Sequence, residues 1–332
     1  MLSYIGRRAL YMVVILLAVS VVAFVIIQLP PGDYLTTVIQ TLKSRGVQVD
    51  AKMIRDLEVH YGLDLPVHVQ YFKWMGNMLQ GDFGRSFNWD RPVVELLAER
   101  LPLTVMVSLM TTFFVYVVAV PIGIYSATRQ YSVGDYLSTV VGFVGLATPN
   151  FLLALILMFF FYKYLGLSTG GLFSPEYQTL PWSLGKVWDM MKHLPIPIIV
   201  IGTAGTAGLI RVVRGCLLDE LQKQYVVTAR SKGVHENVLL FKYPVRLALN
   251  PVVSTIGWML PAIVSGETIT AIVLSLPTTG PLLFRALMTQ DMYLAGSTVM
   301  FLTALTVIGT LLSDILLIIV DPRIRYERKR AQ

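Results

Sequence analysis

Six long apolar stretches dominate the pattern of hydrophobic and polar positions along this chain. Five contain no Asp, Glu, Lys or Arg, and the sixth contains only Asp314; they cover residues 9–29, 101–125, 136–162, 194–210, 247–265 and 292–320. A helix needs about 20 apolar residues to cross the hydrocarbon core of a bilayer. The pattern therefore predicts an all-α membrane protein with six transmembrane helices and both termini on one side.

The first stretch is interpreted as a membrane helix rather than a cleaved signal peptide. Its apolar run of 21 residues is longer than the roughly 7–15 residues of a signal-peptide core, and no small-residue cleavage pattern follows it. The composition of the 332-residue chain agrees, since 55% of its residues are hydrophobic and only 14% are charged. A soluble domain of this length carries more charge.

Proline and small residues interrupt the apolar stretches. Prolines lie at positions 102, 121, 149, 195, 197, 251 and 261, and residues 202–208 are rich in glycine. Proline frees backbone groups that protein or water must satisfy, and small residues let membrane helices approach closely. These features suit a gated pathway but are also tolerated in many other membrane proteins.

The distribution of Lys and Arg predicts the orientation. Residues 7–8, 129, 211–246 and 321–332 hold 15 basic side chains on one side, whereas the short loops opposite hold four. Basic residues are retained in cytoplasmic loops, so both termini are expected to be cytoplasmic. The net charge of +7 follows from this topology and does not indicate nucleic-acid binding.

A polar segment of 71 residues, 30–100, separates the first two apolar stretches. Helical spacing of apolar residues near 50–60 and 67–79 predicts two amphipathic helices in an extracytoplasmic cap. Its aromatic residues, Tyr61, Tyr71, Trp74 and Trp89, are expected against membrane headgroups. The predicted divisions are residues 1–29, the cytoplasmic start and first helix; 30–100, the cap; 101–320, the other helices with a cytoplasmic loop at 211–246; and 321–332, the cytoplasmic tail.

The loop at 211–246 is expected to form a protruding elbow of two short helices. The first should cover about residues 217–232, stopped by Gly233; the second should run from Glu236 to about Tyr243, stopped at Pro244. Ala229 and Gly233 are four residues apart and lack bulk, so another protein could approach the backbone there.

At this loop the sequence resembles the permease subunits of the peptide-type (dipeptide/oligopeptide) family of bacterial ABC importers. The family pattern Tyr-Val-x-Thr-Ala-Arg-x-Lys-Gly is matched at residues 225–233. The likeness extends over nearly the whole chain, through Arg7-Arg8, Pro31-Gly32-Asp33, Tyr61-Gly62-Leu63-Asp64, Gln70-Tyr71, residues 81–86 (Gly-Asp-Phe-Gly-Arg-Ser) and residues 321–326 (Asp-Pro-Arg-Ile-Arg-Tyr).

This resemblance implies the type I ABC importer permease fold in the bacterial cytoplasmic (inner) membrane. It implies that a cytoplasmic ATPase contacts the elbow through Tyr225, Thr228, Ala229, Arg230, Lys232 and Gly233. The implied partners are a second homologous permease, identical or different, two ATPase subunits, an extracytoplasmic solute-binding protein and membrane lipid. ATP and Mg would be bound by the ATPases, so this chain is expected to be no enzyme and to hold no cofactor or metal. The cargo would be an oligopeptide, a dipeptide or an oligosaccharide.

Other features leave two alternatives open. Asn150, Trp258 and Glu267 are candidates for the translocation path, each of which could equally be a packing residue. Glu267 and Asp314 are acidic residues at or within predicted spans, which permits a proton-coupled secondary transporter using this pair. Residues 277–280 (Pro-Thr-Thr-Gly) depart from the family's outer turn, which points to a different outer gate or entrance.

Overall fold

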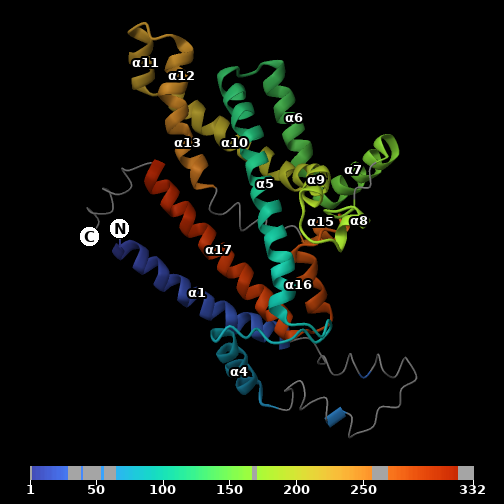
Figure 1. Ribbon diagram of the computed structural model, residues 1–332. Coiled ribbons are helices and arrows are strands. Elements are labelled where there is room, and N and C mark those ends of the chain that lie inside the picture. The colour runs from blue at the N-terminus through green and yellow to red at the C-terminus, as the bar shows by residue number, and fades with distance from the viewer. Residues whose placement is uncertain are drawn as a thin grey trace. The chain divides into compact units, whose positions relative to one another are not determined.

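The computed structural model describes residues 2–28, 39, 54–55, 65–166, 170–255 and 268–320, and these residues are almost entirely helical (Figure 1). Apart from one isolated bridge between Arg85 and Pro92, they contain no paired strand. The expected all-α class is thereby confirmed for this part of the chain. Two compact units are present, one within Met1–Leu103 and Thr278–Val307, the other within Thr104–Pro277 and Ile308–Gln332.

The first unit contains α1 (Leu2–Gln28), α4 (Val67–Leu79), the start of α5 (Val93–Thr128), α16 (Thr279–Met288) and most of α17 (Met292–Val320). The bounds of α4 confirm the expected amphipathic helix over 67–79. The other expected helix, over 50–60, lies outside the described residues except for positions 54 and 55.

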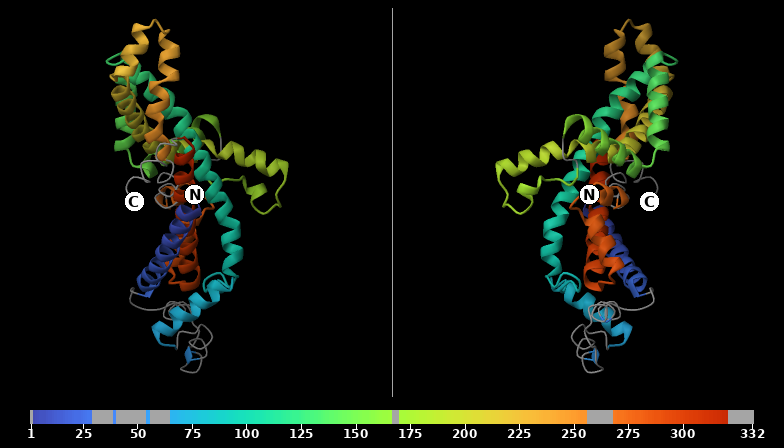
Figure 2. Two further views of the ribbon diagram at one scale, coloured as in Figure 1. Left: turned by 90° about the vertical axis from the view of Figure 1, so that its left-hand side faces the viewer. Right: turned by 90° about the vertical axis from the view of Figure 1, so that its right-hand side faces the viewer.

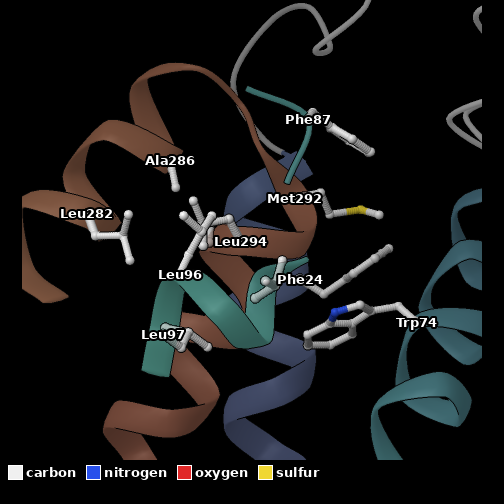
Figure 3. Close-up of a cluster of buried hydrophobic side chains, with 11 residues drawn as sticks. Phe24, Trp74, Phe87, Leu96, Leu97, Leu282, Ala286, Met292 and Leu294 are labelled. Atoms are coloured by element: carbon white, nitrogen blue, oxygen red, sulfur yellow. The ribbon is translucent and has the colours of Figure 1, made fainter. Parts of the chain in front are cut away.

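Buried side chains from five helices form the core of this unit, as Figure 3 shows for Phe24, Trp74, Leu97, Leu282 and Leu294. Trp74 is only 2% exposed, and its ring stacks against that of Phe24 with centroids 6.0 Å apart. The expectation that Trp74 faces lipid headgroups is therefore wrong. The reason is a close approach to Gly296, where a Cβ would come within 2.8 Å of the indole.

Asp291 fixes the loop at 86–88 to the start of α17. Its carboxylate accepts hydrogen bonds from the Ser86 hydroxyl, from the backbone N–H of Asn88 at 3.1 Å and from that of Leu294 at 3.1 Å. The last of these caps the N-terminus of α17, whose first turns have free N–H groups. Asp291 is fully buried, so one side chain joins a loop and a helix that are 200 residues apart in sequence.

The second unit is built around α10 (Pro195–Leu221). It also contains α6 (Val133–Ala147), α7 (Asn150–Leu165), α8 (Pro175–Gln178), α9 (Leu184–His193), α11 (Gln224–Ser231), α12 (Glu236–Lys242), α13 (Pro244–Ser254) and α15 (Thr268–Val273), with the remainder of α5 and α17. α10 packs against α6, α7, α9 and α13.

Small residues allow α10 to lie close to its neighbours. A Cβ on Gly202 would come within 2.9 Å of the Phe114 ring on α5, and one on Gly123 within 2.7 Å of Val213 on α10. Such distances are shorter than real carbon contacts, so glycine is required at both positions for the helices to pack as they do. α6 is joined to α10 by a bidentate ion pair, in which Nε and Nη2 of Arg214 each lie 3.1 Å from a carboxylate oxygen of Asp135.

The expected span over 136–162 is divided at Pro149 into α6 and α7, which meet at 105°. Within the described residues, three other helices are long and apolar enough to cross a membrane: α5, α10 and residues 292–311 of α17. The apolar part of α1, Leu10–Ile26, is shorter, and much of the expected fifth span, 256–265, lies outside the described residues. Six spans therefore remain a prediction.

Candidate functional site

α11 and α12 form a helical hairpin beyond α13, visible in Figure 1 and from two sides in Figure 2. The expected second helix is confirmed as α12, Glu236–Lys242. The expected single helix over 217–232 is wrong, because α10 ends at Leu221 and α11 begins at Gln224. Lys223 has extended backbone angles, φ −72° and ψ 147°, so the chain changes direction between the two helices.

Buried side chains on each side of this break explain it. Leu217 is fully buried with Ala127 of α5 and with Val245 and Ala248 of α13. Val226 is also fully buried but belongs to α11. The sequence over 217–232 contains no Pro or Gly, so tertiary packing overrides a local preference for a continuous helix.

Tyr225 holds the two sides of the break together. Its half-buried hydroxyl donates a hydrogen bond of 2.6 Å to Oε2 of Glu220, in the last turn of α10. Burial and this carboxylate acceptor both raise the pKa of Tyr225 well above its usual range. The phenol therefore stays protonated and keeps donating at any physiological pH.

Gly233 ends α11 with a Schellman motif. The Gly233 N–H donates to the carbonyl of Arg230 at 3.0 Å and the Val234 N–H to that of Ala229 at 3.3 Å. This pattern requires a left-handed residue after the helix, and Gly233 has φ +75°. No atom of the described residues lies within 4 Å of the position a Cβ would take there, so within this part of the chain the space beside Gly233 is open to another molecule.

An ion pair closes the turn between the two elbow helices. The guanidinium of Arg230 bonds both carboxylate oxygens of Glu236, with Nε 3.2 Å from Oε2. Hydrogen bonding and charge from Arg230 lower the pKa of Glu236 below its usual value. Both side chains are exposed, so solvent screens the pair and its main effect is to fix the geometry of the turn.

The other candidate residues differ in exposure. Thr228 and Lys232 are exposed, whereas Ala229 is half-buried. Helical spacing places Ala229 nearer to buried Val226 than to Thr228, so the accessible face of α11 carries Gln224, Val227, Thr228 and Ser231. Of the two residues without bulk, Gly233 is therefore the one that leaves open space.

Exposed apolar side chains accompany these polar ones and were not among the sequence candidates. Val227, Val238 and Phe241 are exposed, the last by 61%. A signal was present, because residues 238–241 are four consecutive apolar residues and a short helix cannot bury all of them on one face. An exposed mixture of apolar and basic groups suits contact with another protein.

Of the three candidate path residues, the structure describes only Asn150. Asn150 is the half-buried first residue of α7, directly after Pro149. Trp258 and Glu267 lie outside the described residues, as does the side chain of Asp314.

Comparison with known proteins covers nearly the whole chain. Residues 119–326 match the family described as "Binding-protein-dependent transport system inner membrane component", and residues 1–110 match the N-terminal region of such membrane components. The elbow lies within the first match.

Individual relatives match over their full length. The chain is 39% identical to the oligopeptide transport system permease protein AppB of Bacillus subtilis, covering 98% of this chain and 100% of the relative. It is 31% identical to the dipeptide transport system permease protein DppB of Alkalihalophilus pseudofirmus, with the same coverages. A chain of the MetNI methionine ABC transporter, in a structure of its inward-facing conformations, shares the fold: the TM-score is 0.53 at 15% identity, over 69% of this chain and 97% of that one.

Proposed function

We propose a mechanism from the premise that this chain belongs to the family of binding-protein-dependent transport system inner membrane components. It is a permease subunit of an ABC importer with the type I permease fold. In the proposed mechanism, the elbow of α11 and α12 receives the movement of a cytoplasmic ATPase and passes it to α10 and α13. That partner, rather than this chain, binds ATP and Mg and hydrolyses the ATP.

Three features of the elbow support this role. The break at Gln222 and Lys223 lets α11 move relative to α10, while the hydrogen bond from Tyr225 to Glu220 limits how far. The open space beside Gly233 and the exposed Val227 and Phe241 offer a surface to a groove on another protein. The single observation that carries the proposal is the Schellman turn at Gly233, which lies within the Tyr-Val-x-Thr-Ala-Arg-x-Lys-Gly pattern.

We propose peptides as the cargo, with an extracytoplasmic solute-binding protein that delivers them and a second permease that completes the path. The support is the naming of the relatives AppB and DppB as oligopeptide and dipeptide permeases, at 39% and 31% identity. The alternative of proton coupling through Glu267 and Asp314 is not favoured by these relatives. Peptide uptake on a pH gradient alone, with the ATPases absent, would revive it.

A bulky substitution on the accessible face of α11 tests the coupling. Thr228→Trp adds a large ring at an exposed helical position without straining the backbone. We expect peptide-stimulated ATP hydrolysis to fall about tenfold in the assembled complex with its ATPases and binding protein, a change within the usual range of coupling free energies.

Gln130→Trp is the matched control. Gln130 is also exposed and lies between α5 and α6, outside the elbow, and it belongs to a loop predicted to face the same side. Full activity in Gln130→Trp together with loss in Thr228→Trp supports the proposal. Equal activity in both variants, with both inserted in the membrane, refutes it.

A further inference from the structure

The helix α9 exposes most of its apolar side chains and buries two of its charged ones. Lys186 and Asp189 are buried, although a short helix on a water-facing loop would expose them. Leu184 is 91% exposed and Trp188 67%. The exposed apolar residues recur at helical spacing and form one face, hereafter the α9 apolar face: Leu184, Val187, Trp188 and Met191.

The buried polar groups fix this orientation. The carboxylate of Asp189 accepts hydrogen bonds of 2.7 Å from both the backbone N–H and the hydroxyl of Ser174. The ammonium of Lys186 donates to the carbonyl oxygens of Gln178 and Leu180 and lies 4.9 Å from the centre of the Phe173 ring. Turning α9 over would break these hydrogen bonds, so they hold the apolar face outward.

The chain places α9 at the end of a membrane helix. Leu194 is both the C-cap residue of α9 and the N-cap residue of α10, and α10 is one of the helices apolar enough to span the bilayer. Pro195 follows at once and lacks an N–H, so the helix can bend there without losing a hydrogen bond. No linker separates the two helices, so α9 lies within one residue of the membrane-spanning segment.

The composition of the face indicates what covers it. Trp188 is 67% exposed on this face, and tryptophan, like tyrosine, is enriched at the level of lipid headgroups. The acidic residue of α9, Asp189, points inward, and exposed Lys192 lies at the edge of the face, where its long stem can reach headgroup phosphates. If the face bound a soluble protein only transiently, these apolar side chains would be exposed to water whenever that protein dissociated, which is unfavourable.

We propose that the α9 apolar face inserts into the headgroup and upper acyl region of the bilayer, parallel to its plane, and anchors the adjoining end of α10. The occupant is phospholipid. The proposal rests on the membrane location of the chain and not on the role of the elbow, so each can fail without the other.

Nitroxide spin labels on α9 test this directly. In the full complex, with the native Cys216→Ser to remove its free thiol, Leu184→Cys and Trp188→Cys place labels on the face, and Lys192→Cys places one at its edge. The complex is reconstituted in vesicles of phosphatidylethanolamine and phosphatidylglycerol. Collisions are measured with oxygen, which concentrates in the bilayer, and with a water-soluble nickel chelate.

The lipid proposal predicts frequent oxygen collisions and few nickel collisions at positions 184 and 188, with an oxygen-to-nickel ratio several-fold higher than at 192. Frequent nickel collisions at 184 and 188 would mean that the face is in water, and few collisions with either reagent would mean that a protein partner covers it. Both results overturn the proposal. Val187→Cys and Met191→Cys lie on the same face and replace less exposed side chains, so they provide the same measurement if either first variant fails to assemble.

Discussion

At Gly233 the backbone conformation, and not crowding by neighbouring atoms, determines which side chain is tolerated. Its φ of +75° favours a residue that tolerates the left-handed conformation, whereas no atom of the described residues lies within 4 Å of its Cβ position. Within this chain a substitution there meets a conformational cost only. Any steric cost would have to come from a partner molecule.

We therefore expect Gly233→Ala to loosen the end of α11. The left-handed conformation costs an L-residue about 1–2 kcal/mol, so hydrogen exchange of the amides at 233 and 234 should accelerate about 5- to 30-fold. Gly233→Asn should show a smaller effect, because asparagine tolerates this conformation better. Unchanged exchange in both variants would show that the Schellman turn does not determine the stability of this helix end.

The bond between Tyr225 and Glu220 gives a second prediction. Tyr225→Phe keeps the ring but removes the donor, at a cost of about 1 kcal/mol, and should broaden the distance distribution between spin labels placed on α10 and α11. Glu220→Gln keeps a carbonyl acceptor and should leave the distribution narrow, whereas Glu220→Ala should broaden it. If Glu220→Ala leaves it narrow, the hydrogen bond does not restrain the break.

At the scale of whole elements, local chemistry predicted helix ends better than helix interiors. The end of α11 near Gly233, the start of α12 and the bounds of α4 follow from Gly, Pro and apolar spacing alone. The break at Gln222 and Lys223 does not, because no Pro or Gly marks it within residues 217–232, and the residues that pack against the end of α10 lie in α5 and α13. For the same reason the burial of Trp74 depends on Gly296, which is more than 200 residues away.

Asp291 connects the loop at 86–88 to the start of α17, a contact that was not predicted from the sequence. Asp291→Ala removes the cap of α17 and leaves the buried Ser86 hydroxyl without its acceptor. We expect it to lower the free energy of unfolding by about 2–3 kcal/mol, measured as a lower thermal midpoint of the purified protein in detergent. Thr289→Ala removes a half-buried hydroxyl that bonds only to carbonyls at the end of α16, so it should shift the midpoint less; equal midpoints in the two variants would contradict the assignment.

The same carboxylate should make stability depend on pH. Burial raises the pKa of Asp291, and the hydrogen bonds it accepts offset this only in part. Between the ordinary pKa near 4 and the raised folded value, the native state binds more protons than the unfolded one, so stability falls as pH rises through the folded pKa. The difference in thermal midpoint between wild type and Asp291→Asn should change with pH in this range, and a constant difference would show that the group does not titrate on unfolding.

For the whole molecule, the membrane class and the permease family follow from the chain's apolar stretches and ordered motifs. The apolar stretches and motifs do not predict the sharp turn between α6 and α7 at Pro149. A proline inside an apolar run is compatible with a mild kink as well as with the observed angle of 105°. The residues that line a path depend on how several helices meet, which is a property of tertiary structure, so residue type alone does not assign Asn150 to the path.

The orientation is testable because the chain has one cysteine. In a Cys216→Ser background, Ser231→Cys on the exposed face of α11 should react with a membrane-impermeant maleimide in inside-out vesicles but not in intact cells. Ser183→Cys, in the exposed segment before α9, should show the reverse, in spheroplasts where an outer membrane would block the reagent. Labelling of both from one side would place the elbow and α9 on the same face of the membrane and refute the predicted topology.

The interruption between α10 and α11 has a mechanical consequence. An unbroken helix is stiff in torsion, so any roll of its far end about the axis would be imposed on the whole rod. α10 and α11 are joined at an extended Lys223, and α11 is also connected to α10 through its packing on α12 and through α13, so push and pull pass along this packing while roll is decoupled at the break. If a rotating ATPase domain grips α11, the elbow acts as a swivel: the translational part of the movement reaches the membrane helices, and the rotation about the axis of α11 is not passed on to α10.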